Sequence, residues 1–592
     1  MGASYMIRPS LIASIAVLAT ACNQATESPA PAIPEEPQTA TVDAQPSLPM
    51  PLPSDTSAAI TGADLRQRIA ALSDDAFEGR GPAAEVGELT ADWIARDLER
   101  VGVQPAGEHG SWFQTVGMVE QTLDEAASGL SFSGGASGED FPMTLKEDAV
   151  LWTKKQDNTE FSWTASDLVF VGYGVTAPEY GWDDYAGLDV EGKTVVMLVN
   201  DPGYAREDEL FKGKSMTYYG RWTYKFEEAG RRGATGAIVI HETAPASYGW
   251  DVVANSWSGA QADLVRSDGG ANRTVFEGWI TEETARALFA EAGLSFEDLK
   301  EAAKTEGFLP VDMGNLQAQG NIVQTVSTTQ SRNVVGMLPG KTAPDEYMLF
   351  TAHWDHLGKK SQEREGEPTQ DFYSDDIFNG AVDNATGTAA LLEIAEALAG
   401  EELERSALFL AVTLEESGLL GSAYYAENPT VPMNQIVAGL NMDAMLPIGK
   451  TKDMVVVGYG ASELEDLLKE HLDETGRVIV PDPNPQAGYF YRSDHVSFAK
   501  KGVPMLYADG GVDKVDGGVA AGKAFAEVYT AQRYHKPMDE YDESWDLTGM
   551  EEDLTALYSV GLKVLQSDLW PTWYAGNEFE AIRQASLAER ED

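Results

Sequence analysis

The segment YMLFTAHWDHLG (residues 347–358) is a short apolar run that ends in histidine and aspartate. The segment TAALLEIAEALAGEE (388–402) then has the apolar spacing of a helix, and SALFLAVTLEE (406–416) is again typical of a buried strand. The alternation continues through IVAGLNMDAM (436–445), ASELEDLLKEHLDETG (461–476) and VPMLYADGG (503–511). Strands that alternate with helices predict an α/β fold, with a mostly parallel sheet covered by helices on both faces.

Residues of the types that bind metals stand at the ends of these strands or in the turns beside them. They are His353, Asp383, Glu416, Asp443 and His535. In open α/β sheets the functional site lies outside the carboxyl ends of the strands, where these side chains would meet. Imidazole nitrogen suits zinc and a carboxylate can bridge two ions. The sequence therefore predicts a hydrolytic site with two zinc ions per chain.

Two carboxylates stand side by side in LEESGLLGS, directly after an apolar strand. We predict different roles for them: Glu416 binds a metal, and Glu415 is the base that takes a proton from water. Asp355 follows His353 by two residues, and residues i and i+2 of a strand face the same way. Asp355 is therefore predicted to orient the ring of His353 through its far nitrogen.

Three further candidates have a structural or a functional interpretation. Asp383 could cap the helix that follows it, but Thr386 can do this instead, which leaves Asp383 to bridge the two ions. Tyr534 is either an ordinary packed aromatic residue or a hydrogen-bond donor to an oxyanion. Arg492, in GYFYRSDH, is the basic residue best placed to hold a terminal carboxylate of a substrate.

The stretch from residue 150 to residue 315 differs in texture from the rest of the chain. Short apolar runs such as DLVFVGYG (167–174) and TGAIVIH (235–241) are separated by clusters of Gly, Pro and Asp. We predict that this stretch is a compact, mostly β domain with its own core. It would be inserted into a catalytic domain that comprises residues 61–149 and 316–592.

The N-terminus has the pattern of an export signal. Residues 1–22 contain one positive side chain, a short apolar stretch, and small residues before Cys22, the only cysteine. This pattern resembles the bacterial lipobox, so Cys22 is predicted to carry a lipid that anchors the exported protein in the cell envelope. A plain secretory signal is the alternative. Residues 23–60, rich in Pro, Ala, Ser and Thr, predict a disordered linker.

The charge balance excludes two classes of partner. The chain has 42 Lys and Arg against 95 Asp and Glu, a formal net charge of −53. Such a surface repels nucleic acid and anionic lipid, so membrane contact is expected only through the anchor at Cys22. The excess of acid fits solubility or adaptation to salt.

The motifs AHWDH, NGAVDNATG, LEESGLLGS, NMDAM, YRSDHVSF and YHKPMDE, in this order, resemble those of di-zinc exopeptidases of the aminopeptidase S and aminopeptidase Y type. Glutamate carboxypeptidase II and the transferrin receptor ectodomain are distant relatives of that family. The resemblance covers about Thr61 to about Leu569. It implies the zinc exopeptidase fold, the ligands and base named above, and a cis peptide bond after Asp383. The stretch 150–315 resembles the protease-associated domain that some members carry.

The resemblance implies a metal-dependent exopeptidase, and we expect an aminopeptidase that hydrolyses N-terminal residues from peptides. The alternative is a dipeptidase or a glutamate-carboxypeptidase-like hydrolase, which would need basic residues to hold a terminal carboxylate. A single-zinc glutaminyl cyclase is less favoured because of the large insert and the complete ligand set. A receptor-like protein without activity would be expected to have lost ligands, and this sequence keeps them all.

Overall fold

The computed structural model describes residues 46–206, 208, 210–359 and 376–591. The predicted signal peptide, Cys22 and the linker up to residue 45 lie outside the described residues and stay predictions. The chain consists of two units, Met1–Ser47 and Leu48–Asp592, and the following account concerns the second. Among the described helices, none has both the length and the apolar character needed to cross a membrane.

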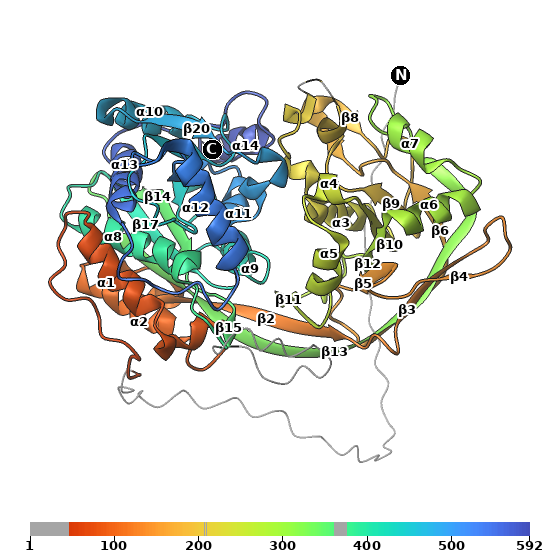
Figure 1. Cartoon of the computed structure of the whole chain (residues 1–592), viewed down its shortest axis with the longest axis horizontal. Coiled ribbons are helices and arrows are strands. Elements are labelled where there is room, and N and C mark those ends of the chain that lie inside the picture. Colours follow the sequence, from red (N-terminus) through yellow and green to blue (C-terminus); the bar gives the residue numbers. More distant parts are fainter. Residues whose placement is uncertain (1–45, 207, 209, 360–375, 592) are drawn as a thin grey trace, which may run out of the picture. The chain divides into compact units, whose positions relative to one another are not determined.

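A mixed sheet lies at the centre of the part that carries the predicted ligands (Figure 1). Its middle consists of four parallel strands, in the spatial order β17 (Arg405–Val412), β14 (Ala343–His353), β18 (Ile436–Asn441) and β21 (Met505–Gly510). Antiparallel partners flank this block: β13 (Val311–Leu338) pairs with β17, and β19 (Asp453–Val456) pairs with β21. The predicted parallel sheet is confirmed for the four middle strands.

The middle strands are buried on both faces, which explains their continuous apolar sequence. In β14, Met348 and Phe350 point into one core, whereas Tyr347 and Leu349 point into the other. Successive side chains of a strand point to opposite faces, so a run of apolar residues serves two cores at once. The carboxyl end of each strand is then left for polar residues.

Helices cover both faces of the sheet (Figure 1). One core is completed by α1 (Gly62–Leu72), α2 (Leu89–Arg100), α8 (Gly387–Ala399), α10 (Leu464–Thr475) and α13 (Thr548–Leu565). The other core is completed by α9 (Leu420–Glu427), α11 (His495–Ala499) and Phe579, directly before α14 (Glu580–Glu591). The predicted two-sided cover is confirmed.

A second pair of cores lies between Leu130 and Ile322. They flank a sheet that contains β3 (Gly129–Ser133), β5 (Ala149–Trp152), β6 (Glu160–Phe170), β9 (Thr194–Leu198), β10 (Gly236–His241) and β12 (Phe276–Thr281). Five helices pack around it: α3 (Trp222–Arg231), α4 (Thr243–Ala246), α5 (Trp250–Ser256), α6 (Glu282–Glu291) and α7 (Phe296–Ala302).

This segment differs in two ways from the domain predicted for residues 150–315. It begins earlier, because β3 already packs in its core, and it contains helices on both sides of its strands. Strand β13 belongs to both sheets: its first part pairs with β3 and β6, and its second part pairs with β2 (Phe113–Leu123) and β17. The assignment of this segment as a protease-associated domain stays a prediction.

The last part of the predicted linker is folded rather than disordered. Leu48, Met50 and Leu52 pack against the core beneath α1 and α2. The indole of Trp93 donates a hydrogen bond to the carbonyl oxygen of Pro51 at 3.2 Å, and Thr56 donates to Glu396 at 2.7 Å. The average composition of residues 23–60 predicts disorder, but these three apolar residues are close together and pack against the core.

A buried ion cluster connects three of the helices. Arg68 of α1 donates to Asp97 of α2 at 2.9 Å and to Glu393 and Glu396 of α8. We expect Arg68→Met to lower the free energy of unfolding by about 3–5 kcal/mol, because it leaves the buried carboxylate of Glu393 without a counter-ion. Urea unfolding followed by tryptophan fluorescence measures this. The matched control is Arg286→Met on α6, whose ion pair with Glu282 is exposed and should contribute about 0–1 kcal/mol. Equal effects of the two substitutions would contradict the expectation.

Candidate metal centre

His353 is the last residue of β14 and is 1% exposed. Its ring Nε2 lies 3.2 Å from Oδ1 of Asp443 and 3.4 Å from Oδ1 of Asp383. Burial alone would lower the pKa of His353, but Glu415, Asp443 and Asp383 together raise it well above its usual value. The ring nitrogen that faces the carboxylates is therefore in the position of a metal ligand.

The role predicted for Asp355 needs a correction. The ring N–H at Nδ1 of His353 donates to the backbone carbonyl of Asp355 at 3.1 Å, whereas the carboxylate of Asp355 is 3.9 Å away. That carboxylate instead accepts a hydrogen bond from the backbone N–H of Glu415 at 3.1 Å. The rule that residues i and i+2 face the same way does not hold here because β14 ends at His353. Asp355 thus orients the ring through its main chain and the Glu415 turn through its side chain.

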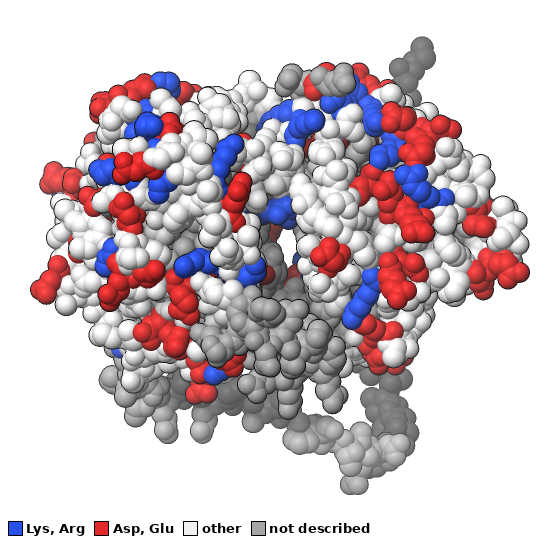
Figure 2. Space-filling view, in the orientation of Figure 1, with Lys and Arg blue, Asp and Glu red and all other residues white. Residues whose placement is uncertain are grey.

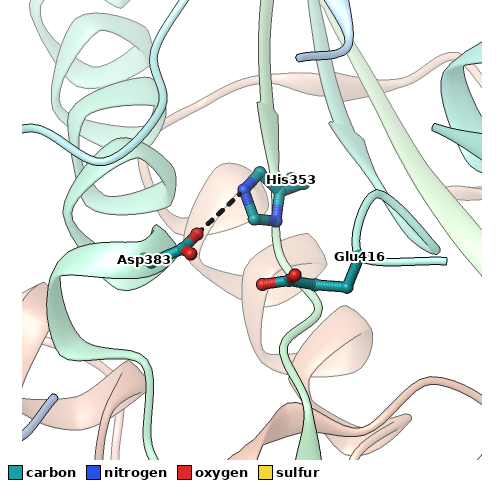
Figure 3. A group of neighbouring side chains, drawn as sticks. All are labelled: His353, Asp383 and Glu416. Carbon is teal, nitrogen blue, oxygen red and sulfur yellow. Dashed lines mark ion pairs between the residues drawn. The ribbon is translucent and has the colours of Figure 1, made fainter. Parts of the chain in front are cut away.

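Asp383 lies between two histidines. One of its carboxylate oxygens is 3.4 Å from Nε2 of His353, and the other is 3.2 Å from Nε2 of His535. Figure 3 shows Asp383 projecting from the turn before α8 toward His353, which projects from the end of its strand. The backbone N–H groups of Val382 and Asp383 donate to the carboxylate of Asp539 at 3.0–3.2 Å, which fixes the turn. Each oxygen of Asp383 is thus available to a different ion.

The peptide bond between Asp383 and Asn384 is cis, as the resemblance implies. The side chain of Asn384 connects the strand ends around the site. Its amide donates to the carbonyl oxygens of His353 and Met442, and its oxygen accepts hydrogen bonds from Gly387 and Ala444. The side chain that follows Asp383 therefore holds β14, β18 and α8 together around the candidate ligands.

Glu415 and Glu416 occupy different surroundings in the turn after β17, although they are adjacent. Oε2 of Glu416 is 3.2 Å from Nε2 of His535, and its Oε1 accepts a hydrogen bond from Nδ1 of His356 at 2.6 Å. Burial and Asp383 would raise the pKa of Glu416, but His356 and His535 lower it to about 2. Burial raises the pKa of Glu415 well above its usual value. Opposite shifts in two titratable neighbours are typical of residues with separate roles.

The remaining ligand candidates complete the two ends of the centre. Asp443 follows β18, and its second oxygen accepts a hydrogen bond from the hydroxyl of Ser493 at 2.6 Å. His535 lies in the loop after α12 (Gly518–Gln532), and the ring of Tyr534 stacks on it with centroids 3.9 Å apart. Tyr534 is 42% exposed, which contradicts its interpretation as an ordinary packed core residue.

The structure brings the predicted ligands and base together in two overlapping groups. Ligand atoms of His353, Asp383 and Glu416 lie within 4.8 Å of one another, and so do those of His353, Glu415 and Asp443. His535 adds to the first group through Asp383 and Glu416. Arg492 is not among the contacts of these residues; its guanidinium lies over the ring of Tyr489.

The centre holds more buried carboxylates than the described cations neutralise. Besides the residues above, Asp494 is buried there, and burial raises the pKa values of both Asp494 and Asp355 to about 7. The nearest arginine, Arg80, donates to four backbone carbonyls, those of Leu72, Trp354, Asn379 and Gly380. Buried carboxylates without a counter-ion are costly, so this donor set fits divalent cations, and its imidazoles favour zinc.

Three residues that shape the centre were not predicted as site residues: Asn384, Ser493 and Arg80. Their roles depend on contacts between distant segments. His356, three residues after His353 in AHWDH, was a weaker candidate than the five ligands, and its ring contacts Glu416.

Comparison with curated proteins finds relatives that are similar to this chain over part of their length. A probable zinc metalloprotease of Pyrenophora teres f. teres (strain 0-1) is 29% identical over 195 residues, 33% of this chain and 36% of that protein. Leucine aminopeptidase 2 of Trichophyton equinum is 26% identical over 224 residues, 36% of this chain and 39% of that protein. The chain therefore matches less than two fifths of the length of these relatives.

Solved structures and family models give two further similarities. An aminopeptidase from Aneurinibacillus sp. strain AM-1 has a TM-score of 0.45 and 16% sequence identity, over 86% of this chain and 95% of that chain. Residues 333–558 match the model of Peptidase family M28.

Proposed function

We propose that this chain, whose residues 333–558 match the model of Peptidase family M28, is a zinc-dependent aminopeptidase that removes N-terminal residues from peptides. One observation carries the proposal. His353 and His535 contact the carboxylate of Asp383 from either side. Each also contacts a second carboxylate: Asp443 for His353 and Glu416 for His535. The similarity to leucine aminopeptidase 2 supports this choice among hydrolases.

The contacts divide the candidate ligands between two positions. His353, Asp383 and Asp443 would hold one zinc ion, and His535, Asp383 and Glu416 would hold the other, with Asp383 shared. Zinc bound there would lower the pKa of a water molecule and polarise the peptide carbonyl. The protein groups around it then position the substrate and move the protons.

Glu415 is the group that moves the proton. Its carboxylate takes a proton from water and returns it to the nitrogen of the leaving peptide. Its backbone N–H is held by the carboxylate of Asp355, which fixes the turn that presents the side chain. The burial that raises its pKa suits a base that must keep the proton until the amine leaves.

Tyr534 would stabilise the charge that develops on the carbonyl oxygen. Its ring is stacked on His535 at an interplanar angle of 25°, so the position of its hydroxyl depends on that of the ligand. The side chain is partly exposed and can approach a bound peptide. A hydroxyl that donates to an oxyanion in a site of low dielectric is worth several kcal/mol, about 2.7–4 for one donor in comparable sites.

Metal removal is the direct test of the proposed function. Dialysis against a chelator should abolish hydrolysis of aminoacyl nitroanilides, and added zinc should restore it. The chelated protein should also melt at a lower temperature, because ions bound at 100 times their Kd contribute about 2.7 kcal/mol each. Mass spectrometry of the active protein should find two ions per chain. Hydrolysis that persists in metal-free protein would refute the proposal, and a single tightly bound ion would contradict the two-ion site.

A further inference from the structure

Arg221 and Arg492 lack the partners that surround most arginines of this acidic chain. Neither guanidinium has an ion pair with a residue that the structure describes, and the buried Nε atom of each donates no hydrogen bond there. Each guanidinium lies over an aromatic ring instead, that of Trp222 at 5.7 Å for Arg221 and that of Tyr489 at 5.4 Å for Arg492. The chain has 95 acidic residues for 42 basic ones, and acidic side chains are spread over the face drawn in Figure 2, so the absence of a carboxylate beside these two is unusual.

The charges of the two guanidinium groups repel each other. Burial and, after it, repulsion from Arg492 lower the pKa of Arg221 to about 10, and the opposing influence comes from Tyr248. Tyr248 is also close to both arginines, which lower its pKa against the effect of burial. Two like charges in a partly buried place destabilise the folded protein unless an anion joins them. The fold itself supplies no anion at this place among the described residues.

The two arginines lie where the segment between Leu130 and Ile322 meets the part of the chain that carries the metal centre. Arg221 directly precedes α3, and Arg492 ends the turn Tyr489–Tyr491. The backbone N–H of Met216 donates to the carbonyl of Pro485 at 3.1 Å, and the rings of Tyr218 and Tyr491 have centroids 6.3 Å apart. The segments that carry the two arginines are therefore in direct contact.

The pair is also adjacent to the candidate metal centre. The residue after Arg492 is Ser493, whose hydroxyl donates to Oδ2 of Asp443 at 2.6 Å. Consecutive Cα atoms are about 3.8 Å apart, so the backbone of Arg492 is within one residue of a group that touches a candidate ligand. The segment that carries Arg492 therefore borders the candidate metal centre.

We propose that Arg221 and Arg492 form a subsite for a carboxylate of the peptide substrate, on the side of the leaving fragment. This inference rests on the proposed aminopeptidase function. A guanidinium pair repels the positive amine at the N-terminus, so the carboxylate must belong to the part of the peptide beyond the scissile bond. The C-terminal carboxylate of a di- or tripeptide meets this condition, and so does an acidic side chain at the second position. The enzyme would then prefer short peptides with a free C-terminus.

The subsite is tested by comparing kcat/KM for peptides with a free C-terminal carboxylate and for the same peptides as C-terminal amides. Wild type should hydrolyse dialanine and trialanine with a kcat/KM about 10–100-fold above that of their C-terminal amides, because charge-assisted hydrogen bonds are lost with the carboxylate. Arg221→Gln and Arg492→Gln should each bring this ratio close to 1. Arg286→Gln on α6 is the control with the same change in charge and should keep the wild-type ratio. Neither alanyl-glutamate amide nor alanyl-glutamine amide has a C-terminal carboxylate. Faster hydrolysis of the first than of the second would therefore show that the subsite binds a side-chain carboxylate.

A binding measurement separates failure of this inference from failure of the proposed function. N-acetyl-dialanine has no free N-terminal amine, so an aminopeptidase should bind it without hydrolysing it. Calorimetry should give it a Kd at least about tenfold below that of its C-terminal amide. Both arginine variants should lose this difference. Alanine nitroanilide, which has no carboxylate, reports the aminopeptidase activity of wild type and of the Arg286→Gln control. Active protein with equal rates for acids and amides, or with a ratio unchanged by either substitution, would overturn the subsite alone. Protein that binds the acid preferentially but cleaves no nitroanilide would keep the subsite and overturn the aminopeptidase.

Discussion

Glu415→Gln is expected to lower kcat for an aminoacyl substrate by about 10²–10⁴-fold while metal content stays at the wild-type level. Glutamine keeps the size of the side chain and can accept a hydrogen bond, but it cannot take a proton from water. The backbone contact from Glu415 to Asp355 is independent of the side chain, so the turn should keep its shape. KM should change much less than kcat, because the substitution removes a group that acts in the transition state.

The neighbouring substitution Glu416→Gln provides the contrast. Both oxygens of Glu416 face histidines, at 3.2 Å from His535 and 2.6 Å from His356, so this carboxylate is in the position of a ligand. Its replacement should lower the affinity for one ion, and activity should be partly recovered by added zinc. Glu415→Gln should not respond to zinc. Metal content by mass spectrometry, measured alongside nitroanilide hydrolysis, decides between them.

Metal content distinguishes the base from a ligand, which distance does not. Ligand atoms of Glu415, His353 and Asp443 lie within 4.8 Å of one another, the same limit as in the group that contains Glu416. Loss of an ion in Glu415→Gln, with two ions kept in Glu416→Gln, would exchange the two roles. Full activity in both variants would place the chemistry elsewhere in the molecule.

The fold around the site could be predicted because its signals are local. A strand buried on both faces must be apolar throughout, and Tyr347–Ala352 is such a run. A polar residue that follows such a run marks the edge of the sheet where the strands end, which is why His353, Glu416 and Asp443 could be assigned together. Asp383 and His535 lie in turns, which have no strand pattern. Their assignment as ligands depended on the order of the motifs along the chain.

Other features depend on contacts that a single segment does not reveal. Helix α12 was not predicted because it buries only Gly522 and Tyr529 and so lacks an apolar stripe of helical spacing. The first part of strand β13 was not predicted, since buried and exposed residues are mixed there and its pairing partners are the distant strands β3 and β6. The pairing of Arg221 with Arg492 joins residues of two separate cores, and neither sequence context indicates the other.

Asp383→Asn is expected to remove both ions and to reduce hydrolysis to the level of the chelated protein. The two oxygens of Asp383 face different histidines, at 3.4 Å and 3.2 Å, so one substitution affects both positions. Asparagine has the same size but offers one neutral oxygen and one NH2 group, whose two N–H donors repel a cation. Asp443→Asn is the matched comparison, because Asp443 contacts His353 but not His535. That variant should retain about one ion per chain at equal zinc concentration.

A second comparison, between Asp383 and Asp539, separates a metal ligand from a residue that positions it. Asp539 accepts hydrogen bonds from the backbone of Val382 and Asp383 and shapes the turn without facing the histidines. Asp539→Asn should therefore weaken metal binding by about 10–100-fold, as is usual for residues that orient a ligand, and excess zinc should restore its activity. Excess zinc should not restore Asp383→Asn. If Asp383→Asn kept one ion as firmly as Asp443→Asn does, Asp383 would be an ordinary ligand of a single ion. The two positions would then have to be held by separate sets of side chains, which the contacts of His353 and His535 with the same carboxylate argue against.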